Sequence, residues 1–213
     1  MAAGLQIFNA SGALQFDTNL SAMSLMAKGT TQLGGVSYTN PSGVAPLIAW
    51  RPQLCNAAHT GTSKNGSTWT FHFEYFETVP GYSVPWWVFD RASAMAPPTG
   101  VAALEIRDGA GGLLFHSHHA PLRMLGFGLG TVPAGKQGAI VGAGIHWQQR
   151  VEVLLDSQGR DTGKIVFDAT AGGLRYDNGT FYNGAKVRSQ SQFSDTDGSG
   201  EVGPALLVDV TNV

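Results

Sequence analysis

The stretch Ser67-Thr-Trp-Thr-Phe-His-Phe-Glu-Tyr-Phe76 decides the fold class of this 213-residue chain. Aromatic residues occupy every second position from Trp69 to Tyr75, and polar residues stand between them. A period of two places these aromatic side chains on one face of a β-strand, and aromatic residues favour strands. Because such an apolar face has to be covered, the stretch predicts one strand of a packed β-sheet.

Strand patterns of the same kind lie on both sides of this stretch. They occur at 84–90, 151–155, 164–168, 175–182 and 206–210, and Asn178-Gly179 predicts a hairpin turn within the fourth of these. No window of about 11 or more residues keeps the apolar periodicity of a helix together with helix-capping residues. Charged residues make up 13% of the chain, against about 25% in an average domain, which excludes coiled coils and long charged helices. The expected fold class is all-β.

A shift of 99 residues brings two parts of the chain into register. Leu5-Gln-Ile-Phe-Asn-Ala-Ser-Gly-Ala-Leu-Gln-Phe16 then lies over Leu104-Glu-Ile-Arg-Asp-Gly-Ala-Gly-Gly-Leu-Leu-Phe115 without a gap. Each segment alternates apolar and polar residues on either side of a turn that begins with Asn or Asp and ends with Gly, which predicts a β-hairpin. A weaker match continues from Met23 over Leu122 to Gly29 over Gly128. The pattern indicates an internal duplication.

The run Pro97-Pro98-Thr99-Gly100 is typical of a linker and stands just before the second copy. We therefore expect an N-terminal β module at 1–96 and a C-terminal β module at 97–213, the second beginning with the repeated hairpin. Many short strands with glycine turns predict two tandem β-sandwich or barrel-like modules related by internal duplication. Trp86 and Trp87 are neighbours on a strand, so we expect them on opposite faces, one in the core and one covered by a loop or another chain.

His116-Ser-His-His119 is the single histidine cluster of the sequence. On an extended strand His116 and His118 would project to the same side, within reach of one metal ion. Two ligands do not complete a site, so such a metal would need groups from other subunits around a symmetry axis. Histidines that face solvent or stand in a turn are the plainer interpretation.

The sequence carries no nucleophile elbow and no phosphate-binding loop in a credible context. We therefore expect a protein that is not an enzyme and that uses no cofactor. A metal-dependent hydrolase built on residues 116–119 is one alternative. The other is a carbohydrate- or receptor-binding β module, in which Trp147, Tyr176 and Tyr182 form an exposed platform for sugar rings.

The net charge of −2 and the pI of about 6.3 exclude the basic surface that nucleic-acid binding requires. The longest weakly polar stretch, at 135–145, is far shorter than the roughly 18 apolar residues of a membrane helix, so we expect no membrane span. The single cysteine, Cys55, cannot form a disulfide within the chain and is expected to be buried and inert.

Three parts of the sequence resemble a known family. Gly4-Leu-Gln-Ile-Phe-Asn-Ala-Ser-Gly-Ala-Leu-Gln-Phe-Asp17, Pro46-Leu-Ile-Ala-Trp-Arg-Pro52 and Val88-Phe-Asp-Arg91, which runs into the second hairpin, look like small virion proteins encoded beside the central tail-tip fibre of long-tailed bacteriophages. The resemblance is good over residues 1 to about 125 and poor over the remainder of the chain. The resemblance assigns no catalytic residues to this sequence.

This resemblance implies a structural component of a phage tail tip or tail fibre, located in the virion and assembled in the host cytoplasm. The implied partners are other phage tail proteins and further copies of the chain, as a homo-oligomer around a threefold axis. Host-cell attachment through a surface receptor or glycan is an additional implied role. Low charge and abundant aromatic residues also suit a surface that other subunits cover.

Overall fold

The computed structural model describes residues 6–8, 14–17, 23–32, 34–40, 44–76, 78–91, 103–142, 146–155, 157–184, 187–191, 199–200 and 205–213. In the strands at 6–8, 14–17, 146–155, 161–172, 187–191 and 199–200 only the course of the backbone is described. All regular elements of these residues are β-strands and every strand pair is antiparallel, which confirms the all-β class. The described residues include no apolar helix long enough to cross a membrane.

The strands are β1 (Gln6–Phe8), β2 (Leu14–Asp17), β3 (Met23–Thr31), β4 (Gly35–Thr39), β5 (Leu47–Trp50), β6 (Asn56–Asn65), β7 (Thr68–Phe76), β8 (Val84–Arg91), β9 (Glu105–Arg107), β10 (Leu113–His116), β11 (Arg123–Phe127), β12 (Gly138–Gly142), β13 (His146–Leu155), β14 (Asp161–Gly172), β15 (Leu174–Asp177), β16 (Thr180–Asn183), β17 (Val187–Ser191), β18 (Ser199–Gly200) and β19 (Ala205–Asp209). The strand patterns found in the sequence at 67–76, 84–90, 151–155, 164–168, 175–182 and 206–210 all fall on strands of this list.

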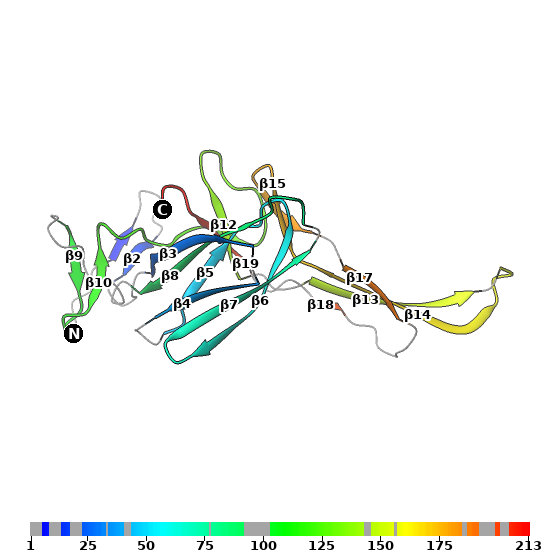
Figure 1. Ribbon diagram of the computed structural model, residues 1–213. Helices are drawn as coiled ribbons and strands as arrows, with labels where there is room; N and C mark the ends of the chain where they lie inside the picture. Colours follow the sequence, from blue (N-terminus) through cyan, green and yellow to red (C-terminus); the bar gives the residue numbers. More distant parts are fainter. Residues whose placement is uncertain are drawn as a thin grey trace.

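Two of the sheets pack face to face and share the main core (Figure 1). One has the strand order β11-β19-β12-β5-β8-β3 and the other the order β16-β15-β6-β7-β4. The predicted aromatic face of β7 lies in this core, because Phe71 and Phe73 are buried there beside Trp50. The arrangement is sandwich-like, with side chains of both sheets in one cluster.

The two edges of the six-stranded sheet are connected by one segment, 120–127. At its start, Leu25 N donates to Ala120 O and Leu122 N donates to Met23 O, both at 2.8 Å, and these bonds join it to the free edge of β3. Further on the same segment becomes β11 and pairs with β19. The face of this sheet that points away from the main core carries a second core cluster, which contains Ala49, Trp87, Phe89, Ala139, Val208 and Val210.

Trp86 and Trp87 lie in different cores. Trp87 belongs to the second cluster, whereas Trp86 packs against the main core on the other face of β8. This confirms the prediction that the two indoles face opposite sides of the strand. Trp86 is covered within the chain, since its ring lies over Gly29 of the neighbouring strand β3.

The expected modules at 1–96 and 97–213 share sheets. β12 pairs with β5 and β15 pairs with β6, so strands from both ranges are hydrogen-bonded neighbours in each of the two packed sheets. The main core also draws side chains from both ranges, and the division into modules at 1–96 and 97–213 stays a prediction. The expected linker at 97–100 lies outside the described residues.

The two hairpins predicted from the repeat are present with the same strand register. In the first hairpin Gln6 pairs with Asp17, Ile7 with Phe16 and Phe8 with Leu14. The pairs of the second hairpin are Glu105 with His116, Ile106 with Phe115 and Arg107 with Leu113, which are the same positions shifted by 99. The register irregularity follows the second pair in both. The turn of the first copy, at 9–13, lies outside the described residues.

A separate four-stranded sheet extends away from the packed sheets, at the right of Figure 1. Its order is β17-β14-β13-β18, and its centre is the long hairpin of β13 and β14. We call this sheet the arm. The hairpin follows β12 and leads into β15, whereas β17 and β18 come from the part of the chain between β16 and β19.

Candidate functional site

The histidine cluster is positioned by the hairpin of β9 and β10. The turn between these strands is held by Asp108, whose Oδ1 accepts hydrogen bonds from Ala110 N at 2.9 Å and Gly112 N at 2.7 Å. Gly111 has a φ of 86°, a left-handed conformation that favours glycine. The turn chemistry seen in the sequence therefore acts as predicted, and it brings Glu105 opposite His116.

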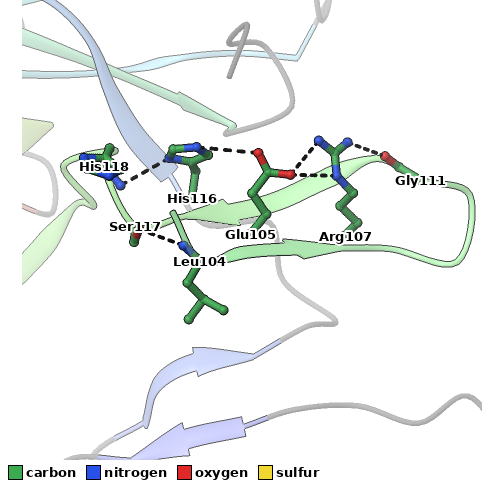
Figure 2. A network of polar contacts seen from close by, with 7 residues as sticks. All are labelled: Leu104, Glu105, Arg107, Gly111, His116, Ser117 and His118. Carbon is green, nitrogen blue, oxygen red and sulfur yellow. Dashed lines mark hydrogen bonds and ion pairs between the residues drawn. The ribbon is translucent and has the colours of Figure 1, made fainter. Parts of the chain in front are cut away.

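A chain of polar contacts runs along this hairpin (Figure 2). Arg107 donates from Nε and Nη2 to Glu105 Oε2 at 3.0 and 2.8 Å, and from Nη1 to the carbonyl of Gly111 at 3.0 Å. The second oxygen of Glu105 lies 3.6 Å from His116 Nε2, an ion pair when the imidazole is protonated. The carboxylate is thus placed between a guanidinium and a buried imidazole, which is 1% exposed.

His116 and His118 do not share one face of an extended strand. β10 ends at His116, and the chain then turns, so that His118 is exposed while His116 is buried. The backbone N of His118 donates to His116 Nδ1 at 3.2 Å, and the two ring centres are 5.6 Å apart. The period of two that predicted a common side applies only as long as the strand continues. The plainer interpretation, a turn histidine facing solvent, holds for His118.

His119 is buried beside this pair. Its ring stacks on the ring of His116 at 4.7 Å and 27° between planes, and its side chain is 6% exposed. Neither Nδ1 nor Nε2 has a hydrogen-bond partner among the described residues. Burial, followed by the neighbouring charges of His116 and His118, lowers the pKa of His119.

In the described part of the chain, no three His, Cys, Asp or Glu side chains are arranged to hold a metal ion. The metal site at His116 and His118, with ligands from other subunits, stays a prediction. The same holds for the hydrolase alternative at 116–119, which depends on such a metal.

The three aromatic residues expected to form a sugar platform are not gathered on one surface. Tyr176 pairs with Phe181, whereas Tyr182 pairs with Arg175, so the two tyrosines lie on opposite faces of the hairpin of β15 and β16. Tyr176 is half-buried, with its ring 4.6 Å from that of Phe181. Tyr182 is 37% exposed. Trp147 belongs to β13 in the arm, and its side chain lies outside the described residues.

A pocket that the sequence did not reveal lies beside Tyr176. Its volume is about 290 Å³, and it is lined by Leu54, Cys55, Asn56, Val79, Arg175, Tyr176 and Asp177. The lining comes from the start of β6, the segment before β8 and strand β15, which are far apart in the sequence. A weak signal was available, since Arg175 and Asp177 are charged residues two apart on a predicted strand and therefore share a face.

Cys55 contributes to the pocket wall but is itself buried. Burial raises the pKa of its thiol, which disfavours the reactive thiolate. The residue agrees with the expectation of a buried, inert cysteine.

Comparison with protein-family models, curated proteins and solved structures gives no match.

Proposed function

We propose that the chain is a structural component of a bacteriophage tail tip or tail fibre that assembles with other tail proteins and with further copies of itself. In this role it is part of the virion, is assembled in the host cytoplasm and takes part in host-cell attachment. The proposal assigns the chain no catalytic role. The resemblance of residues 1 to about 125 to small tail-tip virion proteins supports it, and the observation that carries it is the arm.

The arm has the pattern of a sheet that needs a partner. Val151 pairs with Phe167 and Val153 pairs with Ile165, so apolar positions of both strands fall on the same face of the ladder. The intervening positions include the pair Arg150 and Asp168. A sheet with one apolar face is stable when that face is covered. Because the arm extends away from the two packed sheets (Figure 1), another subunit is the natural cover.

Strand β11 supports a second subunit contact. Phe127 is 88% exposed and Met124 is 67% exposed, and both lie on this short strand. Two large apolar side chains so close together on a surface are typical of a contact region. The assembly role therefore rests on two regions, the arm and β11.

Deletion of the β13–β14 hairpin, the centre of the arm, tests the assembly role. His146 and Gly172 are register partners, so residues 147–171 can be replaced by the two-residue turn Asn-Gly without moving either strand end. We expect the intact chain to form oligomers in light scattering and the shortened chain to be a monomer with unchanged strand-rich circular dichroism. A matched control replaces the tip, 157–160, by Gly-Ser-Gly-Ser and should assemble normally.

Two results would contradict the proposal. One is an intact chain that remains a monomer of 22.4 kDa at every concentration tested. The other is electron microscopy of labelled phage particles in which the chain is absent from the tail. Oligomerisation that survives deletion of the β13–β14 hairpin would remove the arm from the proposal and leave β11, for which Phe127→Ser is the corresponding variant.

A further inference from the structure

The pocket beside Tyr176 has an apolar rim. Leu54 is 59% exposed and Val79 is 53% exposed, and Val79 N donates to the carbonyl of Leu54 at 2.9 Å. Leu54 has a φ of 56°, a left-handed conformation that costs a leucine about 1–2 kcal/mol. Backbone strain of this kind is concentrated at binding and catalytic sites, where the surrounding structure maintains it. The rim is therefore held in an unfavourable conformation with its apolar side chains open to solvent.

The opposite wall is polar and carries both signs of charge. Arg175 and Asp177 are exposed and share the outer face of β15, where Arg175 is also the register partner of Tyr182. Neither side chain takes part in an ion pair with another described residue. Both residues line the pocket, and a guanidinium has five N–H donors while a carboxylate has two acceptor oxygens.

Tyr176 and Asn56 supply further parts of the pocket lining. The Tyr176 ring is fixed by the Phe181 ring at 4.6 Å and by the guanidinium of Arg51 at 5.3 Å from the ring centre. Asn56 is 2% exposed and is one of the lining residues. Since Asn56, Tyr176 and the two charged residues stand on strands, the pocket is formed before any ligand arrives.

The chemistry of the lining residues indicates which class of ligand the pocket would bind. An apolar rim opposite adjacent donors and acceptors suits a molecule with C–H faces and hydroxyl groups that both donate and accept. Asp177 disfavours a simple anion, and Arg175 disfavours a simple cation. The volume, about 290 Å³, is close to the lower limit of about 300–1,000 Å³ for small-molecule pockets, which is the scale of one sugar ring. We propose that this pocket binds a single saccharide unit, and that the exposed Tyr182 beside Arg175 supports the next unit of a glycan.

This inference goes beyond the assembly role and has its own test. The full chain is titrated with the methyl glycosides of glucose, galactose, mannose and N-acetylglucosamine, and binding is followed by saturation-transfer NMR and calorimetry. We expect saturable binding of at least one of them. Asp177→Asn and Arg175→Gln should each weaken that binding at least about tenfold, because each removes a charged hydrogen-bonding partner.

Matched controls are Glu74→Gln on the outer face of the same sheet and Arg91→Gln at the exposed end of β8, which remove the same charges away from the pocket and should leave the affinity within about twofold. None of the four variants should change the oligomeric mass, so failure here is distinct from failure of the assembly role. Absence of binding to every glycoside overturns the inference, as does equal weakening in the pocket and control variants. Binding of inorganic phosphate that survives Asp177→Asn and is lost in Arg175→Gln would overturn the saccharide assignment in favour of an anion site.

Discussion

At the scale of single residues, His119 predicts how the stability of the chain depends on pH. Its pKa is lowered from the ordinary value of 6.5, first by burial and then by the charges of His116 and His118. The unfolded chain therefore binds a proton more readily than the folded chain. The stability that neutral His119 provides is complete above about pH 6.5 and is lost as the pH falls from there to the lowered pKa.

The measurement is the urea midpoint of unfolding between pH 8 and pH 4.5. In the wild type we expect the urea midpoint to decrease as the pH is lowered from 6.5. In His119→Leu this decrease should be smaller, because the contribution of His119 is absent. The control is His72→Gln, which changes an exposed histidine of β7 whose Nε2 lies 2.8 Å from the hydroxyl of Ser63. A His119→Leu variant with the full wild-type pH dependence would show that the effect comes from other groups.

At the scale of elements, the shared register of the two hairpins predicts that they are interchangeable. Replacing residues 104–115 by residues 5–16, with His116 retained, should give a folded protein, because both segments make the same three pairs. We expect the free energy of unfolding to change by no more than about 1–3 kcal/mol, from lost contacts such as Arg107 with Glu105. Thermal unfolding followed by circular dichroism measures it.

The control for this exchange is the same graft displaced by one residue. A one-residue slip moves every side chain to the other face, so the displaced graft should unfold the hairpin and lower the melting temperature much further. Equal stability of the two grafts would contradict a register encoded in the repeat. The duplication itself stays a prediction.

At this scale the sequence predicted the features that depend on neighbouring residues. It missed the features that depend on contacts between distant parts of the chain. The alternation of β7 and the turn at Asp108 depend on neighbouring residues, and both are found as expected. In β5, by contrast, Ile48, Ala49 and Trp50 are all buried, because the strand has a core on each face, and no alternation marks it. The turn that places His118 after the end of β10 was not predicted, because the sequence carries no local signal for where that strand ends.

The candidate site shows the same limit. Tyr176 was singled out as an exposed aromatic residue, yet in the structure it is a pocket wall and a neighbour of Arg51. The other pocket residues, from Leu54 to Asn56 and Val79, carry no motif and come together through the pairing of β6 with β15. That pairing joins distant parts of the chain, and a single sequence contains no local signal for it.

At the scale of the whole molecule, one close approach between backbones tests whether the two halves form a single unit. Gly173 lies where β14 passes into β15, and a Cβ atom there would overlap the carbonyl group of Ala57 and lie 2.9 Å from Ala58 N. Both alanines are fully buried on β6. Gly173→Ala should push β15 away from β6 and destabilise the protein by about 1–3 kcal/mol, as overpacking does.

The control is Gly126→Ala, since no atom lies within 4 Å of the corresponding Cβ and its effect should remain within about 0.5 kcal/mol. Urea unfolding is followed by tryptophan fluorescence, which reports Trp50 and Trp87 in the two cores. Because strands from both halves share the packed sheets, we expect one cooperative transition in which Gly173→Ala lowers the midpoint for both cores together. Two separate transitions, of which the variant moved only one, would mean that residues 1–96 and 97–213 unfold as independent modules despite their shared sheets.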